Sequence, residues 1–442
     1  MDSRSTPRPP LRQMSGADRW FEIKSRIHSK LLDSLSPEEL KSLSKEGVRE
    51  TVGNVVERLI ADDQIPMTVA ERERLIEEVL DEVFGLGPLE PLLKDPSVSD
   101  ILVNGFDNVY VERGGKLVET NVRFKDQAHL RMIIDRIVSA IGRRIDDSSP
   151  IVDARLADGS RACAVIPPLS LIGPVLSIRK FGKKLLSTDD LLKNETLTSG
   201  MLDFLAGCVQ ARLNMVVAGG SGSGKTTLLN TLSRFIPEEE RVVTIEDTAE
   251  LQMQQPHVVR LETRPMNIEG AGAITQRDLV VNALRMRPDR IIVGECRGAE
   301  AFDMMQAMNT GHDGSMTTTH ANSTRDAFSR LEVMVMMATQ NVPDVVIRQM
   351  LAAALQIVIH CSRLTDGTRK ITGISEVLGV EEGHLELQDI FVLERVGIGA
   401  HGRVRGRFVS TGNRPRVLER LSAYGIQLPV SIFEGEQVLK ER

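Results

Sequence analysis

A glycine-rich segment that ends in Lys and Thr carries the clearest chemistry in the sequence. Residues 219–226 read Gly-Gly-Ser-Gly-Ser-Gly-Lys-Thr and match the pattern G-x-x-x-x-G-K-[ST] in full. An apolar run at 215–218 is predicted to be a strand, and a predicted helix follows from Thr227. Glycines let successive backbone N–H groups turn toward a phosphate, and the helix N-terminus adds partial positive charge. A flexible glycine-rich turn is the alternative, but the flanking strand and helix favour a nucleotide site.

The nucleotide site predicted from this segment takes ATP and Mg²⁺. Lys225 is expected to reach the β- and γ-phosphate oxygens, and the Thr226 hydroxyl is expected to ligate the metal ion. The predicted contacts with the nucleotide are Gly220, Ser221, Gly222, Ser223, Gly224, Lys225, Thr226 and Thr227.

Two later strands are predicted to end in carboxylates. Residues 241–246 end in Glu246, and residues 290–295 end in Glu295 after Gly294, which stands where a Walker B strand usually carries Asp. Ligands of an open parallel sheet collect at the carboxyl ends of its strands, so both glutamates are expected near the phosphates. Either could orient the attacking water or hold Mg²⁺, and the sequence leaves open which is the general base. A solvated strand end is the alternative for Glu246.

A histidine follows the small polar segment 311–319. His320 is predicted to sense the γ-phosphate, although a satisfied buried histidine is the simpler reading and a metal pair with His312 has no evident third ligand. The predicted catalytic residues are Lys225, Glu246, Glu295 and His320. The predicted Mg²⁺ ligands are Thr226, Glu246 and Glu295.

Composition is typical of a globular protein that works inside the cell. A length of 442 residues is enough for two or three domains. Hydrophobic residues make up 41% and charged residues 26%, and the net charge is −6. An acidic balance disfavours a nucleic-acid partner. Four scattered cysteines without a C-x-x-C pair predict reduced, mostly buried thiols. Neither an apolar run of about 18 residues nor a signal peptide is present, so a cytoplasmic location is expected.

Composition and periodicity change several times along the chain. Two capping boxes predict helix starts. Ser36 and Glu39 form the first, with Pro37 between them, and Thr68 and Glu71 form the second. Short strands are predicted at 101–104, 109–113, 161–166 and 175–181, with a helix at 127–142. We predict a disordered arm (1–16), a helical bundle (17–84), an α+β domain (85–181), a linker (182–195) and an α/β domain with a C-terminal extension (196–442). The Gly/Arg-rich loop near 398–407 suggests no function.

The order of phosphate loop, acidic segment, Glu strand and His segment resembles the secretion ATPase superfamily of type II, type IV and pilus-assembly motors. The resemblance covers residues 85 to about 380, most of the chain. Several segments look like the Flp/Tad pilus assembly ATPase, the CpaF family. These are 85–93, 99–105, 109–113, 158–161, 175–180 and 287–297.

The resemblance implies an α/β fold: a RecA-like P-loop ATPase domain, an α+β (PAS-like) N-terminal domain and a small N-terminal helical bundle. It implies a homo-hexamer with nucleotide between the two larger domains. Arg161 and Arg179 match N-domain arginines that reach the phosphates in related ATPases. Gly294 in place of Asp is normal in the family. The implied partners are inner-membrane pilus platform proteins, through which the motor would associate peripherally with the inner membrane.

Three alternatives stay open at this point. A type IV secretion ATPase of the VirB11 type is one, although such proteins often lack a segment like 17–84. A DNA-remodelling motor of RecA fold is another, and it should show basic DNA-binding loops. A scaffold that binds ATP without hydrolysing it is the third, and the intact Lys225, Thr226, Glu246 and Glu295 count against it.

Overall fold

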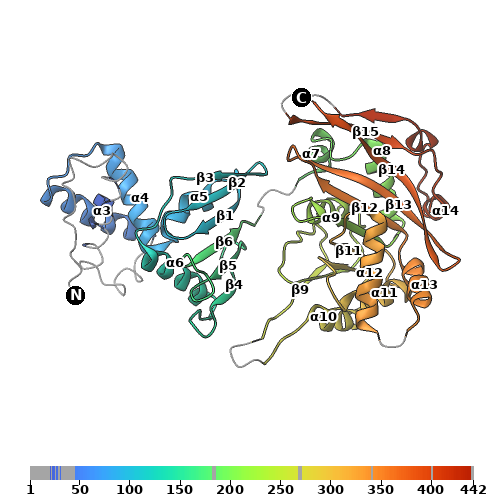
Figure 1. The fold of residues 1–442 in the computed structure, drawn as a ribbon, viewed down its shortest axis with the longest axis horizontal. Coiled ribbons are helices and arrows are strands. Elements are labelled where there is room, and N and C mark those ends of the chain that lie inside the picture. The colour runs from blue at the N-terminus through green and yellow to red at the C-terminus, as the bar shows by residue number, and fades with distance from the viewer. Residues whose placement is uncertain are drawn as a thin grey trace. The chain divides into compact units, whose positions relative to one another are not determined.

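The computed structural model separates the chain into two compact units, Met1–Gly182 and Lys183–Arg442 (Figure 1). The residues it describes are Trp20, 22–24, 26, 27, 30, 45–181, 186–266, 271–339, 342–399 and 402–439. The arm predicted at 1–16 and the helix start predicted at Ser36 lie outside the described residues. Each unit is described by itself.

Two helices are the first elements of the first unit whose bounds the structure describes. Helix α3 spans Lys45–Asp62 and helix α4 spans Val69–Phe84. The predicted capping box is confirmed, since Thr68 accepts from the Glu71 amide while the Glu71 carboxylate accepts from the Thr68 amide. The apolar faces of both helices form a core with Ile23 and Ile27, which precede them in the sequence. The helices contribute Val52, Val56, Leu59, Leu75 and Val79 to this core.

An antiparallel sheet of six strands follows in the same unit, in the order β3-β2-β1-β6-β5-β4. The strands are β1 Val98–Asn104, β2 Val109–Arg113, β3 Lys116–Glu119, β4 Ile151–Arg155, β5 Arg161–Val165 and β6 Val175–Arg179. The buried residues of β1 and β2 alternate and share a core with α6, Gln127–Ala140. The four strands and the helix predicted here are confirmed. The outermost strands, β3 and β4, were missed, and β3 is exposed throughout, so it lacks an alternating pattern.

A buried carboxylate ties the helical part to the sheet domain within this unit. Glu82 of α4 lies 3.0 Å from the Nζ atom of Lys24 and 3.0 Å from Nε2 of His129 on α6. A Cβ atom on Gly87, whose φ is +58°, would lie 2.6 Å from the Glu82 carboxylate. Burial opposes ionisation of Glu82, but the hydrogen bond with His129 and the charge of Lys24 outweigh it and lower its pKa to about 2.

The second unit is built on a ten-stranded sheet, in the order β16-β15-β14-β13-β12-β7-β11-β10-β8-β9. Six neighbouring strands are parallel: β7 Met215–Gly219, β8 Val242–Glu246, β9 Val258–Glu262, β10 Arg290–Val293, β11 Met316–Thr319 and β12 Ile357–Arg363. The antiparallel extension consists of β13 Arg369–Glu381, β14 His384–Ile398, β15 Val404–Ser410 and β16 Glu436–Val438.

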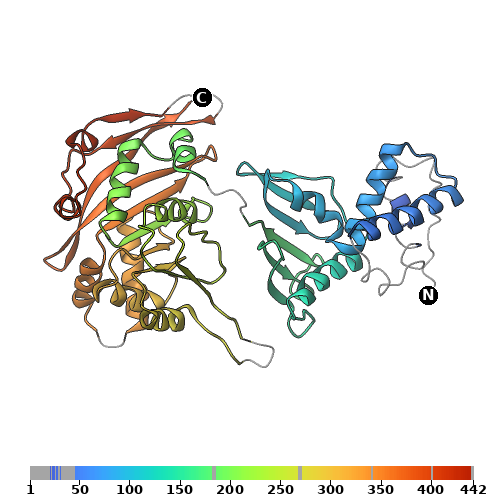
Figure 2. The same ribbon diagram turned by 180° about the vertical axis from the view of Figure 1, so that it is seen from behind.

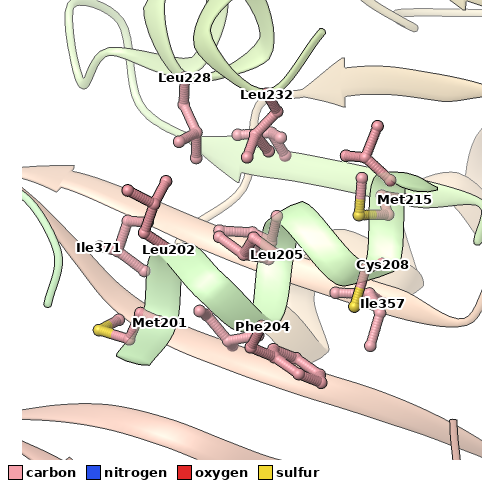
Figure 3. Packing of buried hydrophobic residues seen from close by; sticks show 14 of the residues in the cluster. Met201, Leu202, Phe204, Leu205, Cys208, Met215, Leu228, Leu232, Ile357 and Ile371 are labelled. Atoms are coloured by element: carbon pink, nitrogen blue, oxygen red, sulfur yellow. The ribbon is translucent and has the colours of Figure 1, made fainter. Parts of the chain in front are cut away.

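Helices cover both faces of this sheet. One face packs against α8, Ser199–Gln210, which is in front of the sheet in Figure 2, and against α9, Lys225–Ser233. Figure 3 shows side chains of this core, including Phe204 and Leu205 of α8 and Leu228 of α9. The other face packs against α10 Gln276–Ala283, α11 Glu300–Asn309, α12 Thr324–Ala338 and α13 Asp344–Ala354. Strands β7, β8, β10 and β11 are buried along their whole length, as expected for parallel strands covered on both faces. The predicted α/β architecture is confirmed.

The remaining elements join this unit as well. Part of the range expected to be a linker forms helix α7, Thr188–Lys193, which Ser187 caps with Asp190. The antiparallel extension shares the α8 core, where Phe204, Phe391 and Phe433 lie with ring centroids 5.7–6.0 Å apart. Helix α14, Leu418–Ala423, lies between β15 and β16 in the sequence. All four cysteines are free thiols, and three of them are buried. In the part of the chain that the structure describes, no helix is long and apolar enough to span a bilayer.

Glu82 should be required for the stability of the first unit. Replacement by Gln, Glu82→Gln, is expected to lower the free energy of unfolding by about 3 kcal/mol at pH 7, because it leaves Lys24 and His129 near a neutral group. The pKa of Glu82 is lowered in the folded state, so its contribution is complete above pH 4.5, the ordinary value, and is lost as the pH falls toward about 2. Urea unfolding followed by fluorescence of Trp20, the single tryptophan, measures this loss directly.

The matched control is Glu77→Gln, because Glu77 lies on the same helix, α4, and forms an exposed ion pair with Arg49 of α3. It should change the same free energy by less than about 1 kcal/mol. Equal effects of the two substitutions would contradict a special role for Glu82.

Candidate functional site

Four parallel strands bring the predicted site residues of the second unit to one edge of the sheet. Strands β7, β11, β10 and β8 are adjacent in that order and run in the same direction. Glu246 is the last residue of β8, His320 follows β11 by one residue and Glu295 follows β10 by two, and Lys225 comes at the end of the loop after β7. The topology therefore assembles residues that are up to 95 positions apart, from 225 to 320, in the sequence.

The phosphate loop connects β7 to α9 in a conformation that depends on its glycines. A Cβ atom on Gly219 would clash with the carbonyl oxygen of Cys361 on the neighbouring strand β12. Gly224 caps α9 with a φ of +99°, in the left-handed region. Among the described residues, the buried Ser223 hydroxyl has no hydrogen-bond partner. A backbone cradle, a helix N-terminus and a buried donor together fit an anionic phosphate.

Lys225 begins α9 and is buried against the same loop. Its ammonium donates to the carbonyl oxygens of Gly219 and Gly220, both at 3.0 Å. Because an ammonium carries three donors, these two bonds leave one for a phosphate oxygen. Burial lowers the pKa of Lys225, and the negative charge of Glu295 opposes this shift. Lys225 and Glu295 are therefore close enough for their opposite charges to attract each other.

Glu295 lies at the centre of a charged cluster. One of its carboxylate oxygens is 2.6 Å from the Arg297 guanidinium, and the other is 2.8 Å from Nε2 of His320. Burial lowers the pKa of His320, while the charge of Glu295 opposes that shift. Hydrogen bonding to Glu295 raises the pKa of Arg297, which also lies 3.7 Å from Asp247.

Strand β11 braces the segment that carries Glu295. The Thr318 hydroxyl donates to the carbonyl oxygen of Gly294 at 2.7 Å, and the Cys296 amide donates to the carbonyl oxygen of Thr318 at 2.8 Å. These bonds fix the backbone on both sides of Glu295. The polar residues of the predicted His segment therefore position the glutamate as well as His320.

Glu246 is the last residue of β8, and its carboxylate holds the loop that follows this strand. Its side chain is buried, and one carboxylate oxygen accepts from the amides of Glu250 at 2.9 Å and Leu251 at 2.8 Å. Within the described ranges the other oxygen, which is also buried, has no partner. Burial raises the pKa of Glu246 to about 7, against the effect of the two amides.

Gly294 leaves the space that the Glu246 side chain fills. A Cβ atom on Gly294 would lie 2.9 Å from Cγ of Glu246. The position where a Walker B strand usually carries Asp is thus next to a carboxylate that comes from the neighbouring strand β8. This packing gives a physical reason for glycine at 294.

A metal ion would depend on the nucleotide for many of its ligands. The residues that the structure describes contain no group of three or more His, Cys, Asp or Glu side chains that could hold one. The hydroxyl of Thr226, in the first turn of α9, and the carboxylates of Glu246 and Glu295 have the oxygen donors that suit Mg²⁺, which retains waters and phosphate oxygens as ligands.

The two predicted arginines of the first unit are cross-strand neighbours. Arg161 on β5 is in register with Arg179 on β6, and Arg179 donates to Asp100 at 3.1 Å. Sequence reasoning missed Arg155 on β4, which is in register with Arg161 and extends the row on the same face of the sheet. Their pairing in three antiparallel strands was not evident because β4 was not predicted.

A residue of the second unit that contacts the phosphate loop was also missed. Arg369, the first residue of β13, donates from Nε to the carbonyl oxygen of Gly222 at 2.8 Å. The 147 positions that separate the two residues carry no local signal of this contact.

Comparison with known protein families matches nearly the whole described chain. Residues 82–404 match the family described as type II/IV secretion system protein. Residues 20–84 match the N-terminal domain of type II secretion system protein E.

Individual relatives match over most of their length. A putative conjugal transfer protein of Mycobacterium tuberculosis is 39% identical over 325 residues, which are 71% of this chain and 90% of that protein. The type IV secretion system protein VirB11 of Brucella suis is 32% identical over 322 residues, 66% of this chain and 89% of that protein. The crystal structure of the VirB11 ATPase from the Brucella suis type IV secretion system is 30% identical and covers 67% of this chain and 97% of its own, with a TM-score of 0.37.

Replacing Gly294 should disturb the packing at Glu246. Gly294→Ala is expected to lower the free energy of unfolding of the second unit by about 1–3 kcal/mol, because the new methyl group would overlap Cγ of Glu246. Gly397→Ala is the matched control, since among the described residues, its two chain neighbours aside, no atom lies within 4 Å of its Cβ position. Thermal unfolding of both variants tests the expectation, and equal midpoints would contradict it.

The ionisation of Glu246 should make stability depend on pH. Its folded pKa of about 7 lies above the ordinary 4.5, so the protonated form is favoured by folding and stability is lost as the pH rises from 4.5 through about 7. Glu246→Gln mimics the protonated form and should therefore be more stable than the wild type at pH 8, by up to about 3 kcal/mol, with little difference at pH 4.5. Urea unfolding at the two pH values measures this, and a constant difference would show that burial does not control the carboxyl.

Proposed function

This chain belongs to the type II/IV secretion system protein family, and on that basis we propose that it is a motor that hydrolyses ATP to drive a secretion or pilus-assembly machine. The single observation that carries the proposal is the convergence of Lys225 and Glu295 at the carboxyl edge of the sheet. A buried ammonium beside a phosphate-binding loop suits binding of a triphosphate, and a nearby carboxylate suits activation of water.

Each residue of the cluster then has a role. Lys225 and the loop amides bind the β- and γ-phosphates, while Glu295 accepts a proton from, or orients, the attacking water. His320, 2.8 Å from Glu295, orients that carboxylate and responds to the γ-phosphate. Among the two glutamates, the contact of Glu295 with this cluster favours it as the base. Glu246 keeps a supporting role, because it accepts hydrogen bonds from two loop amides. It is also a candidate to contact Mg²⁺ through the water molecules bound to the ion.

Mg²⁺ supplies charge neutralisation to the bound phosphates. We assign Thr226 as its protein ligand, with Glu295 acting through water. The remaining nucleotide contacts are assigned to Gly220, Ser221, Gly222, Ser223, Gly224 and Thr227.

The first unit is proposed to complete the site in a homo-hexameric ring. Arg161 and Arg179 are assigned to the phosphates of a bound nucleotide, as the family resemblance implies. The cross-strand register of Arg155, Arg161 and Arg179 supports this assignment, because three adjacent guanidinium groups on one face are suited to a polyanion.

Two machines are compatible with this motor. The relatives named as conjugal transfer and VirB11 proteins favour a type IV secretion ATPase. A Flp/Tad pilus motor rests on the CpaF-like segments of the sequence and on the additional domain at 20–84, which matches the N-terminal domain of a type II secretion protein. In either case the motor would bind platform proteins at the inner membrane and associate with the membrane through them.

Substitutions at the two central residues test the chemistry. Lys225→Ala should abolish ATP binding and turnover, because it removes the ammonium that binds the phosphates. Glu295→Gln should keep binding within a few fold but lower kcat by about 10²- to 10⁴-fold, because it removes the proton acceptor. Steady-state hydrolysis and binding of a fluorescent ATP analogue separate the two effects.

Near wild-type turnover of Lys225→Ala would refute the nucleotide assignment. Full turnover of Glu295→Gln would transfer the role of base to Glu246, which Glu246→Gln would then reveal. Deletion of the gene distinguishes the machines: loss of surface pili with intact DNA or protein transfer supports the pilus motor, and the reverse supports the type IV secretion ATPase.

A further inference from the structure

The hairpin between β12 and β13 reaches the phosphate loop. Arg363 at the end of β12 and Arg369 at the start of β13 are in cross-strand register, on the two sides of the turn at 364–368. Arg369 donates from Nε to the carbonyl oxygen of Gly222 at 2.8 Å. A guanidinium nitrogen of Arg363 lies 3.7 Å from the Cβ position of the same glycine.

This contact controls the orientation of one peptide group in the loop. A trans peptide is planar, so its carbonyl and the following N–H point in opposite directions. With the Gly222 carbonyl bound on the hairpin side, the Ser223 amide points the other way and donates to the carbonyl oxygen of Gly220 at 3.4 Å, which closes a turn within the loop. Gly222 has a φ of +67°, in a region that glycine populates about as readily as negative φ, so an external hydrogen bond can favour this conformation over the others open to the residue.

The hairpin itself is fixed by bonds that do not involve the loop. Lys370 is buried and donates to the carbonyl oxygens of Asn194 at 3.0 Å and Glu195 at 2.7 Å, at the end of α7. The Asp366 carboxylate accepts from the amides of Thr368 at 2.9 Å and Val404 at 3.0 Å. Because its backbone is held on both sides, Arg369 can hold the flexible Gly222.

We propose that Arg369 is a positioning residue that holds the phosphate loop in its nucleotide-binding conformation through the Gly222 carbonyl. The inference rests on the proposed function, because it assumes that the loop binds a nucleoside di- or triphosphate. The loop amides act on the bound nucleotide before and during reaction alike, so the effect of Arg369 falls on binding and leaves the chemical step unchanged.

The test compares Arg369→Met with Arg369→Lys in the full chain. Arg369→Met removes the donor and keeps the length, and is expected to raise KM for MgATP and the dissociation constant of ADP about fivefold, with kcat within about twofold of wild type. Arg369→Lys keeps a cationic donor and should recover most of the affinity. Arg407→Met is the matched control: it removes an arginine of the same sheet that pairs with Glu394 and Glu436, and it should leave all these constants unchanged.

An unchanged KM in Arg369→Met would overturn the proposal, as would a fall in kcat with no change in KM. A lowered thermal midpoint without nucleotide, together with no recovery in Arg369→Lys, would show a merely structural role and overturn it too. A wild type that binds ADP but hydrolyses no ATP would refute the proposed function alone, since the ADP affinities of the same variants still decide the role of Arg369.

Discussion

The buried ammonium of Lys225 is the constraint around which the second unit is organised. A charge removed from water must be compensated, and here the compensation comes from two loop carbonyls and from the field of Glu295. Neither is available without the parallel sheet: the loop passes close to the Cys361 carbonyl of β12, which it can do because Gly219 has no Cβ atom, and Glu295 follows β10. The fully buried strands between two helical layers thus determine where the charges lie.

Close packing between neighbouring strands also determines the different roles of the two glutamates. Glu246 fills the volume beside Gly294 and accepts hydrogen bonds from two amides of its own loop. Of the two glutamates, Glu295 is therefore the one that pairs with His320 and Arg297. The raised pKa of Glu246 follows from its burial. The Glu246 side chain occupies the space that a side chain at position 294 would need. The glutamate at 246 therefore requires the glycine at 294.

The sequence was informative where the physical signal is local. The phosphate loop depends on the spacing of neighbouring residues, and the Thr68 capping box on residues three apart, so both could be predicted. The α/β class followed from buried strands alternating with helices. Contacts between distant segments could not be predicted: Arg369 with Gly222, the row that Arg155 extends, and Glu82 with His129 all depend on topology. Strand β3 was missed because an exposed strand has no hydrophobic alternation.

Adjacent residues of one strand also connect the nucleotide loop with the beginning of the second unit. Side chains alternate along a strand, so Arg369 and Lys370 point to opposite faces of β13. One contacts Gly222, and the other contacts Asn194 and Glu195, which follow α7, the first helix described after the segment that leads from the first unit. Two adjacent residues at the start of β13 therefore join the phosphate loop and the end of α7 through hydrogen bonds to their backbone carbonyls, a link between segments that lie far apart in the sequence.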